Sequence, residues 1–537
     1  MKHNQRNHKN RRWDLEKLRP LTLPFLISVL AGLSTGWGHV GNAGDPLRLM
    51  FTSAREHAAF VTNRIHPDAF PPDVAPDLKK WILENKERLA GDILASSHNW
   101  VEQQEPTCAH TLREPGAAIN LSFPTCRVSV QVREDASRLL VHESVHHFDV
   151  DDEAFADAVA DAIYDAWASG ILDWQPTPST QGVIESRSQH AATWDGSYMY
   201  VFGGLTQQTT ISNSLVRFDP GNNRWTALPS LGAEPRYKHE LVLAGDKLIA
   251  WGGFTDIGSG VYQASGQIFD LKNNVWRTIG GTRPAGRSGY VRTSQTASWA
   301  GSRLVVWGSV VPGTGGGASN SSWTPEGGLY DPATDTWSRV ELRGAPIRYA
   351  GHSAVSTGSE VLVWGGKVPP GVQGNNGVLS NEGAIYHPAT NSWRAMSTRN
   401  APSPRMDHVA VWTGSKMIVF GGSDNTRNIK GSGGIYDPAT DTWSSFTSEV
   451  ASQRVGHTAV WTGDEMLIWG GRTSDSYFSA VVAFNPRTSI WRSLAVASNP
   501  TPRDQHTAVW TGMSMIVWGG GAEDRRTRLD SGGLFYP

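Results

Sequence analysis

Cysteine is scarce in this sequence of 537 residues, which contains only Cys108 and Cys126. A charge excess is also lacking, because 48 lysines and arginines stand against 50 acidic residues and give a net charge of -2. The scarcity of cysteine excludes a disulfide-rich scaffold. The balanced charge gives no electrostatic drive toward nucleic acid or anionic membranes, so neither is expected as a partner. The length predicts two or three domains.

Long hydrophobic runs are missing except for one near the N-terminus. Basic residues are concentrated in residues 1–19, an apolar run covers residues 21–33, and small residues follow at 41–44. The run is short for a membrane span, so the pattern predicts a signal peptide over residues 1–44. We therefore expect an exported protein (secreted, periplasmic or at the cell surface) with no stable membrane span after cleavage. An uncleaved anchor is the alternative, because the basic segment is unusually long.

Residues 45–170 have helix-like patterning and no repeat, and they contain both cysteines. In an exported chain, an isolated pair favours a disulfide between Cys108 and Cys126 over two free thiols. Such a bond would stabilise a small domain by about 3 kcal/mol in the chain-entropy model. Apolar spacing and capping residues predict three helices and a strand, at Asp77–Leu94, Asp135–Phe148, Asp151–Ala168 and Ala117–Phe123, respectively.

A repeat of about 50 residues fills the chain from residue 171 to residue 537, and this is the length of one propeller blade. A small-residue pair follows the second strand of each unit, and a tryptophan marks the fourth strand. The first glycine of the pair occurs at Gly203, Gly252, Gly308, Gly365, Gly421, Gly470 and Gly519, and the tryptophan at Trp225, Trp276, Trp337, Trp393, Trp443 and Trp491. The last unit lacks its fourth strand, and Trp174 lies in the matching register. We expect the strand around Trp174 to complete the last blade and close the ring.

The paired glycines, the Tyr-Asp pairs at 330–331 and 436–437, and the spaced tryptophans resemble kelch repeats. The resemblance implies a closed, mainly β, seven-bladed propeller over residues 171–537. It does not fix a function, since kelch propellers include enzymes and pure binding modules. We interpret the glycines and tryptophans as structural, for tight turns and for packing between blades. Galactose oxidase shares this fold, but its copper-radical chemistry needs a cysteine, and residues 171–537 contain none.

The clearest chemical signal lies before the repeats, in the HExxH motif His142-Glu143-Ser144-Val145-His146 on a predicted helix. Histidines at positions i and i+4 lie one turn apart on one face, so both imidazoles can bind one Zn²⁺. The glutamate between them can accept a proton from water at the metal. The motif predicts His142 and His146 as zinc ligands and Glu143 as the catalytic base. The alternative is an exposed polar helix face.

A third ligand is expected on the next helix, where Glu153 and Asp157 form an ExxAD element. HExxH followed by ExxAD resembles small gluzincin-type metallopeptidases. By that resemblance, Glu153 is the third zinc ligand and Asp157 orients a histidine. Only six residues separate His146 from Glu153, so a tight connection is required. Asp149, Asp152 and Asp157 remain rival ligands.

The resemblance also implies that residues 45–170 form a small, mostly helical α+β domain of the zincin type. The strand Ala117–Phe123 would then be the edge along which an extended peptide pairs. Tyr164 and His110 are candidate oxyanion donors. A purely structural zinc site is the alternative, although closed structural sites usually add cysteines.

Every repeat begins with an arginine, and a histidine usually follows. The arginines are Arg187, Arg236, Arg287, Arg348, Arg405, Arg454 and Arg503, and the histidines are His190, His239, His352, His408, His457 and His506, with Tyr290 in the third repeat. A ring of arginines can hold a carboxylate, an acidic peptide or an acidic sugar. We favour a structural role for both sets. Pairing with the acid of the Tyr-Asp strand cannot explain the whole ring, because only Asp219, Asp270, Asp331 and Asp437 supply that acid.

Three functions are consistent with these patterns. The leading hypothesis is an exported zinc metallopeptidase whose propeller binds the peptide substrate or a partner. The second is a binding or adhesion protein with an inactive zincin domain. The third is a carbohydrate-directed activity in the propeller. Partner specificity would lie in the long loops Val310–Gly327 and Lys367–Glu382, or these are tolerated insertions.

Overall fold

The computed structural model describes most of the propeller and part of the N-terminal region. The described residues are 58, 62, 74–95, 98–101, 109–110, 119–122, 133–146, 152–170, 174–178, 180, 182–258, 262–280, 295–312, 323–347, 350–368, 378–448, 450–494, 499–524 and 526–537. The predicted signal peptide and both cysteines of the predicted disulfide lie outside them. Within these ranges, no helix is both long enough and apolar enough to cross a membrane.

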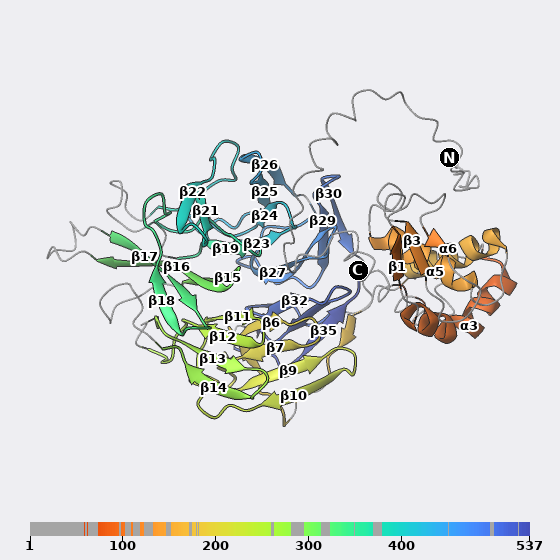
Figure 1. The fold of residues 1–537 in the computed structure, drawn as a ribbon, viewed down its shortest axis with the longest axis horizontal. Helices are drawn as coiled ribbons and strands as arrows, with labels where there is room; N and C mark the ends of the chain where they lie inside the picture. The colour runs from red at the N-terminus through yellow and green to blue at the C-terminus, as the bar shows by residue number, and fades with distance from the viewer. Residues whose placement is uncertain are drawn as a thin grey trace. The chain divides into compact units, whose positions relative to one another are not determined.

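The N-terminal region contains three described helices and a small sheet (Figure 1). Their bounds are α3 Pro76–Ala95, α5 Arg133–His146, α6 Glu153–Gly170, β1 His98–Val101, β2 Ala109–His110 and β3 Ile119–Ser122. The helices lie within two residues of their predicted bounds. They share a small core in which Ile82, Val141 and Val159 are fully buried. Trp81 of α3 meets Phe155 of α6 edge to face, with ring centroids 5.3 Å apart.

The predicted edge strand has a different place in the sheet. The strand order is β1-β3-β2, with β3 parallel to β1 and antiparallel to β2. The segment predicted as an edge is therefore the central strand, and that prediction was wrong. Among the described strands the free edges belong to β1 and β2, and β2 lies beside α5.

The repeats form seven four-stranded antiparallel sheets arranged in a ring (Figure 1). Blade 1 consists of β6 Ala191–Trp194, β7 Met199–Phe202, β9 Leu215–Asp219 and β10 Arg224–Leu228, and blade 2 of β11 Glu240–Ala244, β12 Lys247–Trp251, β13 Gly266–Asp270 and β14 Val275–Thr278. Blade 3 consists of β15 Thr296–Ala300, β16 Arg303–Pro312, β17 Trp323–Asp331 and β18 Thr336–Arg339, and blade 4 of β19 Ser353–Ser356, β20 Val361–Trp364, β21 Gly383–His387 and β22 Ser392–Ala395.

Blades 5 to 7 continue the ring. Their strands are β23 Val409–Trp412, β24 Met417–Phe420, β25 Ser432–Asp437 and β26 Thr442–Thr447; β27 Val455–Trp461, β28 Met466–Arg472, β29 Val481–Asn485 and β30 Ile490–Leu494; β32 Thr507–Trp510, β33 Met515–Trp518, β35 Gly532–Phe535 and β4 Trp174–Pro176. Two short pairs, β5 Arg187–Ser188 with β8 Leu205–Thr206 and β31 Arg503–Asp504 with β34 Gly521–Ala522, extend blades 1 and 7.

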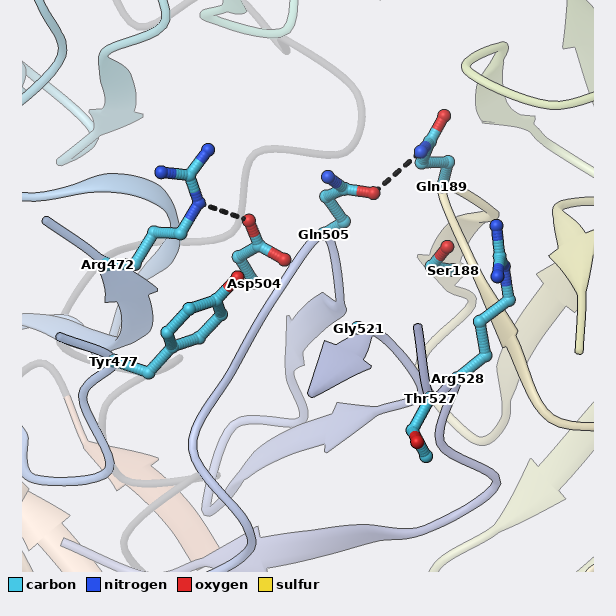
Figure 2. A pocket seen from close by; sticks show the side chains of 9 residues that line it. All are labelled: Ser188, Gln189, Arg472, Tyr477, Asp504, Gln505, Gly521, Thr527 and Arg528. Atoms are coloured by element: carbon cyan, nitrogen blue, oxygen red, sulfur yellow. Dashed lines mark hydrogen bonds and ion pairs between the residues drawn. The ribbon is translucent and has the colours of Figure 1, made fainter. Parts of the chain in front are cut away.

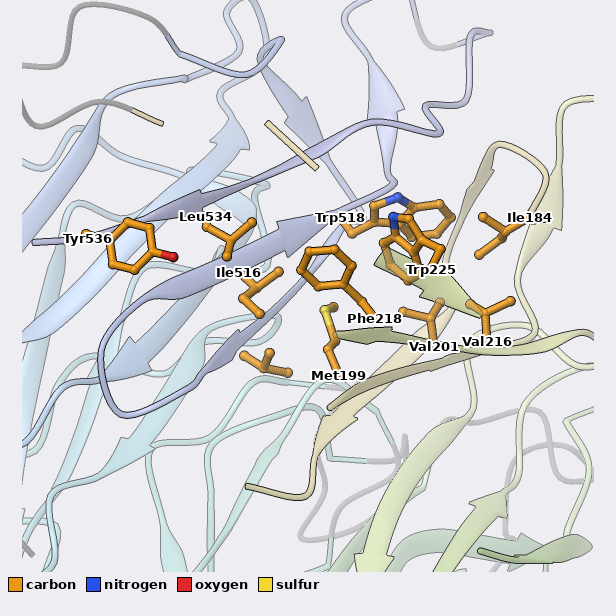
Figure 3. Packing of buried hydrophobic residues seen from close by; sticks show 11 residues of the cluster. Ile184, Met199, Val201, Val216, Phe218, Trp225, Ile516, Trp518, Leu534 and Tyr536 are labelled. Atoms are coloured by element: carbon orange, nitrogen blue, oxygen red, sulfur yellow. The ribbon is translucent and has the colours of Figure 1, made fainter. Parts of the chain in front are cut away.

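The ring closes as the sequence predicts. Trp174 of β4 pairs with Phe535 of β35, so the first strand of the repeat region completes the last blade. The first strand of blade 7, β32, in turn lies beside β6 of blade 1. Figure 3 shows the core at this junction, where Trp225 and Phe218 of blade 1 pack against Trp518 of blade 7. Closure leaves no blade without neighbours on both sides.

The fourth-strand tryptophans pack between blades, as predicted. Each meets the aromatic side chain before the glycine pair of the preceding blade. The ring-centroid distances are 5.3 Å for Trp225–Trp518, 4.7 Å for Trp276–Phe202, 4.9 Å for Trp337–Trp251, 4.7 Å for Trp393–Trp307, 5.3 Å for Trp443–Trp364, 5.1 Å for Trp491–Phe420 and 5.2 Å for Trp174–Trp469. One aromatic contact thus repeats at all seven junctions.

Blade 3 differs from the others in its middle hairpin. The segment 310–327 was expected to be a loop, but β16 continues to Pro312 and β17 begins at Trp323. The register shifts between Trp307 and Ser309, which marks a bulge at Gly308. This hairpin therefore projects further than those of the other blades.

Candidate functional site

Helices α5 and α6 bring the predicted zinc ligands together. His142 Nε2 lies 3.1 Å from Glu153 Oε2 and 3.2 Å from His146 Nε2, and His146 Nε2 lies 3.7 Å from Glu153 Oε1. The three ligand atoms lie within 4.8 Å of one another. The His142 and His146 side chains are only 15% and 13% exposed, so they do not belong to an exposed polar helix face.

The spacing of these atoms fits a tetrahedral metal ion. Two ligand atoms that each lie about 2.0–2.1 Å from a tetrahedral zinc ion are about 3.3 Å apart. The pairs that include His142 match this separation, and the third pair is slightly wider. Two imidazoles and one carboxylate, with no cysteine, are the donor set of zinc sites that keep a coordination position open. The residues therefore fit a catalytic zinc ion.

The rival acids have other partners in the described structure. Asp157 Oδ1 lies 2.9 Å from His142 Nδ1, so Nδ1–H donates to the carboxylate and the Nε2 lone pair faces the ligand cluster. Asp152 caps α6, because its Oδ1 accepts hydrogen bonds from the backbone N–H groups of Ala154 and Phe155 at 3.0 and 3.3 Å. Asp149 lies outside the described residues. Among the described acids, Glu153 is thus the best-placed third ligand.

Glu143 lies inside the domain rather than on its surface, with 7% of its area exposed. Burial, together with the negative charge of Glu153, raises the pKa of Glu143 to about 7. The influence of Glu153 requires the two carboxyl groups to be near each other. Among the other candidates, Tyr164 and His110 belong to α6 and β2, but their side chains lie outside the described ones.

The arginines at the start of the repeats are buried. Arg187, Arg236, Arg405, Arg454 and Arg503 are at most 2% exposed. In each of these blades Nη1 donates to the carbonyl oxygen of the first glycine of the pair, sixteen residues later; the distances are 2.9, 2.8, 3.0, 3.4 and 2.9 Å to Gly203, Gly252, Gly421, Gly470 and Gly519. Arg287 and Arg348 lie outside the described residues.

A recurring serine completes this arginine site in four of the five blades. The serines are Ser214, Ser265, Ser432 and Ser531, each just before or at the start of the third strand. In blade 6 the guanidinium of Arg454 instead lies 4.4 Å from the ring centre of Phe478. These five guanidinium groups are therefore structural, as favoured from the sequence, so the described arginines do not support the alternative of an acidic or sugar ligand.

The Tyr-Asp acids do not pair with these arginines either. Asp219, Asp270, Asp331 and Asp437 accept backbone N–H groups two or three residues ahead and so close the turn before the fourth strand. The recurrence of serine before the third strand was visible in the sequence, and it was the signal that the arginine partner lay there.

The histidines are also buried, and most bond to the neighbouring blade. Nε2 of His190, His352, His408 and His506 lies 2.8–3.0 Å from the hydroxyl of Thr507, Thr296, Ser353 and Thr458, respectively. Each hydroxyl belongs to the first strand of the preceding blade. His239 and His457 lack this partner, because Ala191 and Val409 occupy the corresponding positions. Burial and the neighbouring arginines lower the pKa of His239, His408 and His457 to about 3.

In blade 3 the histidine position holds Gln295 rather than Tyr290. Gln295 precedes Thr296, which pairs with Trp307 as Ser353 pairs with Trp364 in blade 4. Gln295 is 1% exposed, and its Oε1 accepts a hydrogen bond from Trp251 Nε1 at 3.1 Å. The assignment of Tyr290 was wrong, because the arginine chosen as the start of this repeat set the register too early.

The glycine pairs have the role that the sequence predicts. At Gly421, φ is 74° and an added Cβ would lie 2.5 Å from Cε1 of His457 in the next blade. At Gly422, φ is 85° and an added Cβ would lie 2.5 Å from the carbonyl oxygen of Met406. Only glycine fits this left-handed turn between two blades.

The first strands surround a channel that contains a cavity of about 480 Å³. The residue that precedes each buried histidine has left-handed backbone geometry, and several of these residues link neighbouring blades around the channel. The backbone N–H of Gln189 donates to the backbone carbonyl of Gln505 at 3.1 Å, that of Lys238 to the carbonyl of Gln189 at 2.9 Å, and that of Asp407 to the carbonyl of Gly351 at 3.0 Å. A smaller pocket of about 170 Å³ adjoins the cavity (Figure 2), where Arg472 Nε bonds Asp504 at 2.8 Å.

Comparison with known proteins gives family matches over the repeat region. The Attractin/LZTR1 beta-propeller family model matches residues 164–427 and 229–479, and the KLHDC2/KLHL20/DRC7 Kelch-repeats domain matches residues 435–531. The overlapping matches reflect a repeat that aligns in more than one register.

Individual relatives are similar over part of the chain. The chain is 28% identical to acyl-CoA-binding domain-containing protein 6 of Oryza sativa subsp. japonica over 208 residues, or 38% of this chain and 30% of that protein. It is 27% identical to human Kelch domain-containing protein 3, over 44% of this chain and 64% of that protein, and 25% identical to host cell factor of Drosophila melanogaster, over 43% and 17%. The chain thus spans less than two thirds of the length of these relatives. With seven closed blades and family models that cover residues 164–531, it belongs to the kelch-repeat β-propeller proteins.

Proposed function

We propose that the protein is an exported zinc-dependent metallopeptidase, with its catalytic centre in residues 45–170 and a kelch propeller that binds the substrate or a partner protein. The observation that carries the proposal is the convergence of His142, His146 and Glu153 within 4.8 Å, with the HExxH glutamate buried beside them. A zinc ion bound there supplies Lewis acidity, which lowers the pKa of water and polarises a carbonyl group.

The protein groups have separate tasks in this proposal. Asp157 holds the His142 ring through Nδ1–H and so fixes the Nε2 lone pair toward the cluster. Glu143 accepts a proton from the attacking water and delivers it to the leaving amine. The free edge of β2, beside α5, can pair with the backbone of an extended peptide.

A binding protein with an inactive zincin domain is the second candidate function. The family models match the repeat region, and this supports a binding role for residues 171–537. Burial of the Glu143 carboxyl carries a cost that a catalytic role would explain, and this favours the peptidase.

The test is zinc content and peptide cleavage by the full chain and three variants. We expect about one zinc ion per chain in the wild type and in Glu143→Gln, and at least a tenfold loss of zinc in His146→Ala. Glu143→Gln should lower cleavage of a peptide library by at least a hundredfold, because the proton acceptor is removed. Glu87→Gln, an exposed change of the same kind on α3, serves as the control. Normal turnover by Glu143→Gln would refute the peptidase.

A further inference from the structure

One wall position of the channel differs in chemistry from its equivalents in the other blades. This position is the residue that follows each buried histidine, or Gln295; it begins the first strand in six blades and lies inside β27 in blade 6. In blade order these residues are Ala191, Glu240, Thr296, Ser353, Val409, Thr458 and Thr507. Only Glu240 is ionisable, and it lines the cavity of about 480 Å³.

Glu240 has no counter-charge in the described structure. Its carboxyl makes no hydrogen bond or ion pair with the described residues, and burial alone raises its pKa to about 7. Asp407 lines the same cavity. The cation in the lining, Arg472, is already engaged with Asp504. The positive charge of Lys238 already acts on Asp407. Among the described charged residues that line the cavity, Glu240 is therefore the one left without a charge partner.

A buried donor in the same wall is also left without a partner. Gln295 is 1% exposed, and its Oε1 is occupied by Trp251 Nε1. Its Nε2 makes no hydrogen bond, although Gln295 lines the cavity. A buried donor without an acceptor is unfavourable. An acceptor supplied by a ligand would remove that cost.

Two glycines also line the cavity. Gly351 and Gly456 have left-handed backbone conformation at the position where other blades carry Lys238, Asp407 or a glutamine. The volume of the cavity lies in the range of ligand pockets. A divalent metal ion does not fit, because among the described residues only the His142 cluster brings three ligand atoms together.

We propose that the propeller channel binds a cationic side chain of a partner polypeptide. The ammonium or guanidinium group lies against Glu240, and a peptide carbonyl beside it accepts the hydrogen bond from Gln295 Nε2. The cationic group of the ligand neutralises the carboxyl of Glu240, and its carbonyl accepts the hydrogen bond that Gln295 Nε2 otherwise does not make. This binding does not depend on the proposed peptidase centre.

The test measures peptide binding to the full chain by calorimetry. The probes are acetyl-Gly-Lys-Gly-amide, its glutamine and glutamate counterparts, and n-butylammonium. We expect the lysine peptide to bind and the other two peptides to bind at least tenfold more weakly. Glu240→Gln should weaken the lysine peptide at least tenfold, Asp407→Asn less, and the exposed Glu523→Gln not at all.

Two controls make the result decisive. Glu240→Gln should melt at the same or a higher temperature than the wild type, because it removes a buried carboxyl, so lost binding is not lost folding. Glu143→Gln should bind the lysine peptide like the wild type, which separates this site from the metal centre. Equal affinity of Glu240→Gln and wild type, or no binding of the lysine peptide, would overturn the proposal. Butylammonium that binds as tightly as the peptide would overturn the assignment to a polypeptide.

Discussion

The described arginines at the start of the repeats donate hydrogen bonds to backbone carbonyl groups, and these bonds use the donors that a ligand would need. The guanidinium of Arg405 donates to the carbonyls of Gly421 and Ser432 at 3.0 and 2.6 Å, and burial lowers its pKa to about 10. Its donors are used within its own blade. Removing it would leave two buried carbonyl oxygens without a donor.

We predict that Arg405→Gln lowers the free energy of unfolding by about 3 kcal/mol, since buried acceptors lose their charged donor. Urea denaturation of the full chain measures this. The exposed Arg399→Gln should change stability by less than about 0.5 kcal/mol. If Arg405→Gln kept full stability, the structural role of this arginine would be wrong.

Some of these residues could be interpreted from sequence and others could not. His142 and His146 were predicted from helical spacing, and Glu153 and Asp157 from a resemblance, because side-chain chemistry is encoded in residue type. The hydrogen-bond partners of the arginines were not predicted, because every residue has a backbone carbonyl and residue type does not mark which one is used. The strand at 119–122 was placed at an edge because pairing on both sides depends on distant segments.

The first strands of the blades hold a layer of buried, neutral histidines. Their pKa values lie at about 3 for His239, His408 and His457, and well below the ordinary value of 6.5 for His190 and His506. In addition to burial, the positive charges of Arg236, Arg405 and Arg454 lower the pKa of His239, His408 and His457, respectively. In the unfolded chain these histidines would take up protons below about pH 6.5, and in the folded chain they would not.

We predict that the propeller loses stability as the pH falls from 7 toward 5. The unfolded state then binds more protons, so each histidine contributes a slope of at most about 1.4 kcal/mol per pH unit. Glu240 and Asp407 oppose the trend, because their raised pKa values favour the folded state at lower pH, but they are two groups against five histidines. Urea midpoints at pH 7.5, 6.5 and 5.5 measure the slope. His457→Gln removes one of these histidines, so it should reduce the slope by the contribution of about one proton. An unchanged slope in this variant would contradict the proposed role of the buried histidines.

At the scale of the whole molecule, the ring depends on one non-covalent junction. In blades 1 to 6 the fourth strand follows its partner through a tight turn, whereas β4 meets β35 from the opposite end of the repeat region. Trp174 is 5% exposed and packs 5.2 Å from Trp469 and 5.3 Å from Phe535. Packing and backbone pairing alone hold β4 in place.

We predict that Trp174→Ala destabilises the propeller by about 3–5 kcal/mol and exposes blade 7 to proteases. Trp276→Ala, which removes the equivalent contact in blade 2, is the matched control, and its strand stays tethered by the turn from β13. Thermal melting and limited proteolysis of the full chain compare the two. Equal protease resistance in both variants would show that closure is not the weak point.

The closing strand also has a consequence for the order in which the molecule is made. During synthesis β4 emerges before every other strand of the propeller, and its partner β35 emerges after the strands of six complete blades. Until β35 has been made, the backbone N–H and C=O groups of β4 have no native strand with which to pair. A nascent chain in this condition can pair with the wrong edge or with another copy of itself. The growing propeller therefore has most need of a chaperone over the interval between these two strands.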